Sequence, residues 1–536
     1  MTDDLTAPSF RLIPRAVSDA GSLAADVLAG RAASELFRGV IGTGPVEALA
    51  PRPGRLSPGA FVTTSRTDRG KLETILAGGG HLVTTGQQPG LFLGPLYTLY
   101  KAASAIKLAA DLERSSGLPT LAVFWVAADD HDWKEVGGCR VLAADESLVE
   151  FRLEVPAGRA GRSVGETVLP DSIRDDIERL TQLFGSTWTD DEVADHLGPL
   201  CTSYQPGETI AGAFTSAMAE LFASSELAFV DSSHPEVRTV ASGLYRGLAA
   251  RASEIVDAMA RGRKTVEDAG YTAHLTPPGS GLQLFHDSGV GRAHVLVTGD
   301  TFGTPDGQRW SGEMLESHLA EHPLSFTPAA ALRPVLESWM LPVAASVLGP
   351  GELAYWAQLR PLFATLQVEM PLVAARDSWR LVETRVDRLL GKLGVDSDLV
   401  EQGEDALRRE VLDAGRPKRV TDALAALHAE IGDQLAHLAE AADEELPGLR
   451  SATGKALSAV ERSLEDLGRV VDRKVAERQA TALEQARRLT ANLAPGGTFQ
   501  ERALGAVSYL GRYGPQLVDR LVATESRYVA GLQGQD

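Results

Sequence analysis

The sequence predicts an α/β protein whose core is a parallel sheet, with a long helical hairpin near its C-terminal end. Five apolar runs are bounded by Gly or Pro, and most precede stretches with helical periodicity. This alternation is typical of parallel sheets with crossover helices. From about residue 385 the composition changes to Ala, Leu, Glu and Arg. At 536 residues the chain is too long for one compact core, so we expect two or more domains.

The expected core strands are continuously apolar, which is typical of strands buried on both faces of a parallel sheet. They are His81–Thr85, Leu121–Val126, Leu227–Val230, Val343–Val347 and Pro371–Ala375. A helix is predicted over Tyr97–Leu112, where apolar residues share one stripe. Residues 146–200 and 262–325 interrupt the alternation with polar strands and many Gly, Pro and Asp. We interpret both segments as insertions over one edge of the core.

Two series of apolar residues, spaced three or four apart, predict an antiparallel coiled-coil hairpin. They span Val420–Leu446 and Leu457–Val471, with the helix breaker Pro447-Gly448 between them. The expected domains are an α/β core over 1–385, a helical coiled-coil domain over 386–490, and a tail over 491–536 that packs back on the core.

Composition excludes several classes of function. The formal net charge is −20, so the basic surface of a nucleic-acid binder is not expected. The two cysteines, Cys139 and Cys201, do not make a disulfide framework. No stretch is long and apolar enough to span a membrane, and no signal peptide is evident. We therefore expect a cytoplasmic protein.

The first candidate segment is the Gly-rich loop after the strand at His81–Thr85, with Gly86, Gln87, Gln88 and Gly94. In open α/β sheets ligands bind at the carboxyl ends of strands. Small residues let the backbone approach a phosphate or carboxylate, and the following helix N-terminus attracts negative charge. The two glutamines suit the orientation of a polar substrate. The alternative is a tight packing turn, but the position and the polar content favour a ligand loop.

The second candidate segment follows the strand at Leu121–Val126. It holds three carboxylates and an imidazole in a row, Asp129, Asp130, His131 and Asp132. Such a cluster can perturb pKa values, act as a general base, bind an amine or hold Mg²⁺. The alternative is a polar cap on the next helix. We take Asp130, His131 and Asp132 as candidate catalytic residues and assign no metal ligands.

Two further segments follow later strands. Arg333 can donate two parallel hydrogen bonds to a carboxylate or phosphate, and Tyr355 and Gln358 lie in the next Gly/Pro loop and helix. Arg376 and Ser378 follow the last apolar strand. We take all five as candidate substrate-binding residues. The alternative for Tyr355 is a place in the core, which is the more common role of such an aromatic ring.

The first segment resembles the HIGH region of class I aminoacyl-tRNA synthetases, because Phe92-Leu93-Gly94-Pro95 stands in the place of His-Ile-Gly-His. Both histidines are missing, so adenylate chemistry through them is not supported. The whole chain resembles one family more closely, the cysteine-adding enzymes of bacillithiol biosynthesis (BshC). The segments that carry this resemblance, in order, are TGQQPGLFLGPLYTLYK, VFWVAADDHDW, LRP, GPGELAYWAQLRPLF, ARDSW, FQER and YLGRYG. Asp129 replaces the glutamate that members usually have.

The resemblance implies a Rossmann-like core, similar to class I synthetases, with connecting insertions, a coiled-coil domain and a homodimer. It implies a ligase that joins the carboxyl of L-cysteine to the amine of glucosaminyl-malate. Amide formation from a free carboxylate is unfavourable in water, so ATP or another activating nucleotide is expected, with Mg²⁺ alongside it. In this scheme Asp130 or Asp132 holds the ammonium and His131 accepts its proton, since imidazole exchanges protons near neutral pH. Arg333 or Arg376 holds a malate carboxylate or a phosphate.

Two rival interpretations remain from the sequence. One is a synthetase-like nucleotidyltransferase acting on another amino acid or a tRNA, which the acidic charge and the missing histidines disfavour. The other is a non-catalytic coiled-coil scaffold, which the polar residues at four strand ends disfavour.

Overall fold

The computed structural model describes residues 9–15, 22–31, 35–42, 50–155, 161–185, 189–275, 281–289, 291–445 and 450–528. The chain divides into two compact units. The core unit comprises Leu12–Arg380 and Leu504–Asp536, and the helical unit comprises Met1–Arg11 and Leu381–Ala503. The first two points of division fall within strands β1 (Phe10–Pro14) and β15 (Trp379–Glu383), and the third lies between Ala503 and Leu504.

A six-stranded sheet forms the centre of the core unit. In order across the sheet its strands are β14 (Leu372–Ala375), β13 (Val343–Leu348), β3 (His81–Gln87), β4 (Thr120–Val126), β7 (Leu227–Asp231) and β2 (Phe61–Thr63). The first five are parallel, and the edge strand β2 is antiparallel to β7. The five parallel strands are the predicted ones, and the predicted α/β fold class is confirmed.

The strand order reverses beside β3. From β3 the chain adds β4 and β7 on one side, and later adds β13 and β14 on the other. The loops that leave neighbouring strands at such a reversal point diverge and open a crevice at the carboxyl edge of the sheet. This is the edge at which Gln87, the end of β4 and the loop after β13 meet.

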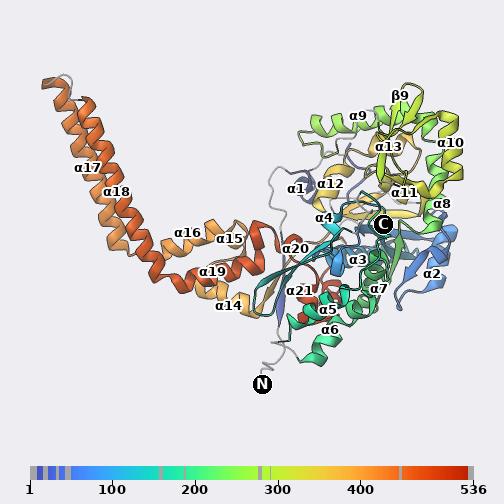
Figure 1. Ribbon diagram of the computed structural model, residues 1–536, viewed down its shortest axis with the longest axis horizontal. Helices are drawn as coiled ribbons and strands as arrows, with labels where there is room; N and C mark the ends of the chain where they lie inside the picture. Colours follow the sequence, from blue (N-terminus) through green and yellow to red (C-terminus); the bar gives the residue numbers. More distant parts are fainter. Residues whose placement is uncertain are drawn as a thin grey trace. The chain divides into compact units, whose positions relative to one another are not determined.

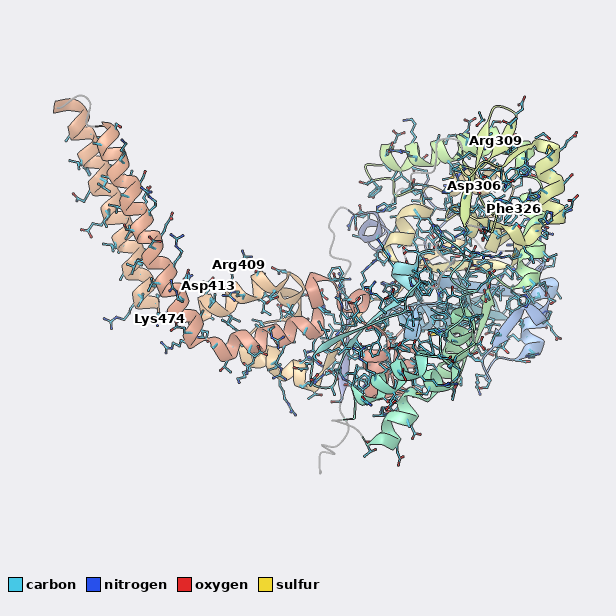
Figure 2. The ribbon with its side chains drawn as sticks, in the orientation of Figure 1. Asp306, Arg309, Phe326, Arg409, Asp413 and Lys474 are labelled. Atoms are coloured by element: carbon cyan, nitrogen blue, oxygen red, sulfur yellow. The ribbon has the colours of Figure 1, made fainter. Side chains whose placement is uncertain are left out.

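A second sheet in the core unit has five antiparallel strands and is built largely from the segment predicted as an insertion over 262–325. In order across the sheet they are β11 (Arg309–Ser311), β10 (Thr301–Gly303), β9 (Arg292–Thr298), β8 (Gly281–Asp287) and β12 (Phe326–Pro328). Figure 2 labels Arg309 and Phe326 in this sheet, and Asp306 in the turn between β10 and β11. Buried apolar side chains of both sheets, such as Trp125 of β4 and Leu284 of β8, belong to one hydrophobic core.

The remaining elements of the core unit are helices and one small hairpin. The hairpin pairs β5 (Gly138–Leu142) with β6 (Leu148–Arg152). The helices are α1 (Leu23–Leu28), α2 (Arg69–Thr74), α3 (Tyr97–Ser116), α4 (Trp133–Val136), α5 (Ile173–Gln182), α6 (Asp190–Ser203), α7 (Ile210–Leu221), α8 (Pro235–Tyr245), α9 (Ala252–Asp268), α10 (Gly312–Glu321), α11 (Leu332–Met340), α12 (Pro350–Trp356), α13 (Arg360–Thr365), α21 (Val507–Tyr513) and α22 (Gln516–Val522).

The helical unit is dominated by two long helices, α17 (Lys418–Glu445) and α18 (Arg450–Arg478), which pack side by side as an antiparallel hairpin (Figure 1). This confirms the predicted coiled coil, although the predicted break at Pro447-Gly448 lies outside the described residues. The other helices are α14 (Thr384–Leu393), α15 (Ser397–Glu401), α16 (Glu404–Gly415), α19 (Ala480–Leu493) and α20 (Gln500–Ala503). In the described part of the chain, no helix is both long and apolar enough to cross a membrane.

Candidate functional site

A cavity of about 510 Å³ lies between the carboxyl edge of the six-stranded sheet and strands β8 and β9 of the second sheet. This volume is in the usual range for small-molecule sites. The polar residues lining it, among those described, are Gln87, Gln88, Asp129, Asp130, His131, Glu135, Gln283, Arg292, His294, Arg333, Glu352 and Tyr355. The sequence predictions placed Gly86, Gln87, Gln88, Asp130, His131, Arg333 and Tyr355 at a site, and all seven line this cavity.

The end of β3 supplies one wall. Gly86 pairs with Trp125 of β4, and a Cβ atom at this position would lie 2.8 Å from the Trp125 carbonyl oxygen. Glycine is therefore required here, because the backbone of β4 lies too close for a side chain. The amide group of Gln87 donates to Glu135 (2.8 Å), and that of Gln88 donates to both Asp130 (2.8 Å) and Glu135 (3.2 Å). The two glutamines thus orient carboxylates across the cavity.

The segment after β4 supplies the acidic wall. Asp129 is buried and accepts the hydroxyl of Ser232 at 2.6 Å. Asp130 accepts the His131 backbone N–H at 2.7 Å and lies 3.6 Å from the Arg292 guanidinium. Burial alone would raise the pKa of Asp130, but the hydrogen bonds from His131 and the charge of Arg292 outweigh it and hold this pKa below its ordinary value.

His131 is held by an arginine that the sequence analysis did not consider. Arg292 Nη1 lies 3.1 Å from His131 Nδ1. The same Nδ1 lies 3.4 Å from Asp130 Oδ1. An arginine nitrogen can only donate, so Nδ1 accepts from Arg292 when the ring proton is on Nε2, and it donates to Asp130 when the proton is on Nδ1. Arg292 is itself fixed, because it is buried and donates to Thr327 Oγ1 (2.9 Å) and to the Pro328 carbonyl (3.3 Å).

Glu135 of α4 is a second carboxylate in the cavity wall beside Asp130. Among the described residues, its hydrogen-bond donors are neutral groups, the two glutamine amides and the Tyr97 hydroxyl (3.4 Å). Desolvation by the surrounding protein raises the pKa of the Glu135 carboxyl, and the hydrogen bond from Gln87 partly opposes this shift. Asp130 and Glu135, which share the Gln88 amide, therefore have their pKa values displaced in opposite directions.

The rear wall is a network of buried charges. Arg333 forms an ion pair with Glu337 and donates to the Tyr355 hydroxyl at 2.5 Å. Lys101 forms an ion pair with Glu352 at 2.7 Å. Arg333 thus lines the cavity while it is paired with a carboxylate of the wall, and its predicted role in holding a substrate anion stays a prediction.

Gly94 does not line the cavity, which corrects its predicted place in the cleft. The loop before it is buried, and Phe92 and Leu93 adopt positive φ angles of 50° and 72°. The hydroxyl of Tyr204 accepts the Leu93 N–H (3.1 Å) and donates to the Gly90 carbonyl (3.1 Å), which fixes this strained turn. The alternative of a tight packing turn therefore holds for the second half of the loop.

The start of α3 is also closed. The backbone N–H of Leu96 donates to the Leu504 carbonyl at 2.9 Å, and the Gly94 carbonyl accepts from Ala506 at 3.0 Å. The C-terminal segment thus covers this helix end. In this part of the loop the N–H groups of Leu93, Gly94 and Leu96 already donate to protein acceptors, so they are not available to a phosphate.

Asp132, Gln358, Arg376 and Ser378 also lie outside the cavity lining. Asp132 caps α4 by accepting the N–H groups of Lys134 and Glu135, so the alternative of a polar cap on the next helix holds for this residue. The Gln358 side chain pairs with the backbone of residues 274 and 275.

Arg376 and Ser378 follow β14, at the far edge of the strand order from β4. The buried Arg376 side chain donates to the Asp377 carbonyl and lies over the Tyr97 ring. Ser378 lies beyond the strand, where its carbonyl accepts the Arg15 N–H at 2.9 Å. Their predicted contact with substrate stays a prediction.

The sequence analysis missed several residues of the site. Arg292 and His294 are two residues apart on β9, so their side chains share one face of the strand. This spacing is visible in the sequence, but no local pattern indicates that the face lines the cavity. Glu135 lies in the acidic segment itself and could have been considered. Gln283 and Phe285 complete the wall from β8. In the described part of the chain, no group of three or more His, Cys, Asp or Glu side chains could hold a metal ion.

Comparison with known proteins connects this geometry to one family. The family model described as “Bacillithiol biosynthesis BshC, N-terminal Rossmann-like domain” matches residues 61–377, and the one described as “Bacillithiol biosynthesis BshC, C-terminal coiled-coil domain” matches residues 380–530. Relatives named “Putative cysteine ligase BshC” are similar over most of their length. The protein from Symbiobacterium thermophilum is 32% identical, covering 84% of this chain and 82% of the relative. Those from Koribacter versatilis and Salinibacter ruber are each 31% identical, covering 83% and 84% of this chain and 82% of either relative.

Proposed function

The chain belongs to the BshC family of bacillithiol biosynthesis, and from that premise we propose that it is a cysteine ligase. In the proposed reaction the carboxyl carbon of L-cysteine is joined to the amine nitrogen of glucosaminyl-malate. A C–N bond forms and one carboxyl oxygen of cysteine leaves. The substrates are small molecules, in keeping with a cavity of about 510 Å³.

The observation that carries the proposal is the position of the cavity. Its walls come from segments 86–88, 127–135, 283–294 and 328–355, and all of these lie within the match to the family's Rossmann-like domain. The cavity also has the chemistry that an amine substrate requires. Asp130 and Glu135 are two carboxylates that share one amide donor, and an ammonium group is the ligand that two such carboxylates attract.

The energy source is part of the proposal. Because a free carboxylate does not form an amide spontaneously in water, we propose that ATP or another nucleotide, with Mg²⁺, activates the cysteine carboxyl. The turn at Gly94 and the start of α3 are closed by Tyr204 and Leu504, so we do not assign the phosphates to that loop.

We also propose that the protein acts as a homodimer in the cytoplasm. Large apolar side chains lie exposed along the hairpin, and such a stripe is a surface for a second copy of the chain. They are Val420, Leu427, Leu438, Leu467 and Val470. The cytoplasmic location rests on the two cysteines, both of which are free.

The test is formation of the amide by the purified protein. L-cysteine and glucosaminyl-malate are incubated with ATP, with another nucleoside triphosphate or with none, each with Mg²⁺, and products are measured by mass spectrometry. We expect a product with the mass of both substrates less one water, formed only when a nucleotide is present. A folded protein that gives no such product with any nucleotide would refute the proposed activity.

A further inference from the structure

We propose that Glu135 takes the proton from the substrate amine, and that Asp130 and Glu135 together form the binding site for this amine. This inference rests on the proposed function and adds to it a residue that the family resemblance did not supply. At neutral pH much of an amine is protonated, and a protonated amine has no lone pair with which to attack. Some group in the cavity must therefore accept a proton before the C–N bond forms.

His131 is the obvious candidate from sequence, but its geometry is unfavourable. Its Nδ1 lies 3.1 Å from the Arg292 guanidinium and 3.4 Å from Asp130 Oδ1, so a second ring proton would place a charged imidazolium against a fixed cation. Arg292 is buried and anchored to Thr327 and to the Pro328 carbonyl, and cannot swing away without losing both bonds.

The neighbouring carboxylates of Asp132 and Asp130 are suited to roles other than that of the base. Asp132 uses its carboxylate to cap α4 and lies outside the cavity lining. Asp130 accepts from the His131 backbone and from Gln88 and lies beside Arg292, so its environment favours the charged form. A carboxylate stabilised in this way attracts an ammonium group well but takes its proton poorly.

Glu135 differs from Asp130 in its partners. It lines the same cavity, and its hydrogen-bond donors are the neutral groups of Gln87, Gln88 and Tyr97. The charged groups that face it are Asp130 from the β4 end, Asp132 from its own turn and Lys101 from α3. Desolvation raises the pKa of this carboxyl, which narrows the gap to the pKa of an amine and makes the transfer less costly.

The Gln88 amide marks where the amine would sit. Its Nε2 lies 2.8 Å from Asp130 Oδ2 and 3.2 Å from Glu135 Oε2, so one nitrogen with hydrogens bridges the two carboxylates. An ammonium nitrogen that displaced the Gln88 amide from that position would make the same two contacts with stronger, charge-assisted bonds. In the proton step the N–H bond of the ammonium breaks, its electron pair stays on nitrogen, and the proton bonds to a Glu135 carboxylate oxygen.

The test compares turnover of the full-length variants Glu135→Gln and His131→Gln with that of the unmodified protein, as a function of pH and at saturating substrates. A base must be deprotonated, so kcat of the unmodified protein falls as pH drops through the titration of the base. We expect Glu135→Gln to lower kcat by about 10²–10⁴-fold and to abolish the fall of kcat at low pH, which we call the acidic limb of the profile. His131→Gln should retain the limb. Glu254→Gln, an exposed glutamate on α9 outside the cavity, controls for loss of a surface charge.

The outcomes distinguish failure of the proposed function from failure of the role assigned to Glu135. If the unmodified protein makes no cysteinyl amide, the proposed function fails. If it does, and Glu135→Gln keeps near-normal kcat with the same acidic limb, only the assignment of Glu135 fails. Should Glu135→Gln not fold, as judged by circular dichroism, the His131→Gln profile still decides, because loss of its acidic limb would identify His131 as the base.

Discussion

The ammonium group of Lys101 lies 2.7 Å from the Glu352 carboxylate, and this buried ion pair ties α3 to the start of α12. Lys101 also donates to the Gly86 carbonyl (2.7 Å) and to the Gln87 side chain (3.1 Å). Burial raises the pKa of Glu352, but the charges of Lys101 and Arg333 outweigh it and keep this pKa below its ordinary value. One lysine thus fixes three of the residues that line the cavity.

Replacing Lys101 with Met should therefore leave a buried carboxylate without its main partner. We expect the free energy of unfolding to fall by about 3–5 kcal/mol, measured by urea denaturation. The double variant Lys101→Met/Glu352→Gln should recover part of the loss, because it removes the unpaired charge. Lys264→Met breaks an exposed pair with Asp268 and serves as the control, with no measurable change expected. Equal losses in the single and double variants would contradict this account of the pair.

The two carboxylates that share Gln88 should respond to pH with opposite sign. The lowered pKa of Asp130 means that its carboxylate stabilises the fold at higher pH, and this contribution is lost as pH falls through the folded-state pKa. The raised pKa of Glu135 means that its charged form is disfavoured by folding, so the penalty grows as pH rises through its titration.

Asp130→Asn and Glu135→Gln measure this difference. As pH rises from acidic to neutral, the unmodified protein should gain stability relative to Asp130→Asn and lose stability relative to Glu135→Gln. The measurement is urea denaturation of all three proteins across that range. Slopes of the same sign for both variants would contradict the opposite environments described for these two groups.

Gly262 of α9 should not tolerate a side chain. A Cβ atom there would lie 1.9 Å from the Gln358 carbonyl oxygen, and Gln358 in turn supports Leu275 of the cavity wall. We expect Gly262→Ala to cost about 1–3 kcal/mol or more of stability, since backbone must move to relieve the clash. Gly432 of α17 has no atom within 4 Å of such a Cβ, and Gly432→Ala should stabilise its helix by roughly 1 kcal/mol. Destabilisation by both changes would show that packing is not the cause.

The apolar stripe of the hairpin should set the oligomeric state. Introducing charge with Leu467→Glu/Val470→Glu should convert the proposed dimer to a monomer, because both side chains are exposed and apolar on α18. Light scattering coupled to gel filtration measures the mass. Lys474→Glu, a polar position on the same helix that Figure 2 labels, should leave the dimer intact. A monomeric unmodified protein would refute the dimer, and a dimeric double variant would place its interface elsewhere.

The strands and the hairpin were predictable because they depend on local patterns. The five parallel strands are apolar runs, and α17 and α18 carry long periodic stripes. The edge strand β2 was missed because Phe61–Thr63 is too short to form a pattern. Helix α3 begins at Tyr97, as its apolar stripe predicts, but the loop before it is closed by Tyr204 and Leu504, whose positions no local rule reveals.

The site residues were predictable only where a polar or charged side chain directly follows a strand. Gln87, Gln88 and Asp130 lie at the ends of β3 and β4, so the rule for open α/β sheets finds them. Arg292 could not be found in this way, since it lies 161 positions from the His131 that it contacts. Without Arg292, the imidazole seemed free to act as a base, and the role that we now assign to Glu135 was not visible.

A crystal structure with glucosaminyl-malate bound tests the central claim most directly, because that claim is about position. The account predicts that the glucosamine nitrogen lies within hydrogen-bond distance of both Asp130 and Glu135, in the place of the Gln88 amide. A structure with the sugar amine outside this cavity, or with a malate carboxylate between Asp130 and Glu135, would contradict it.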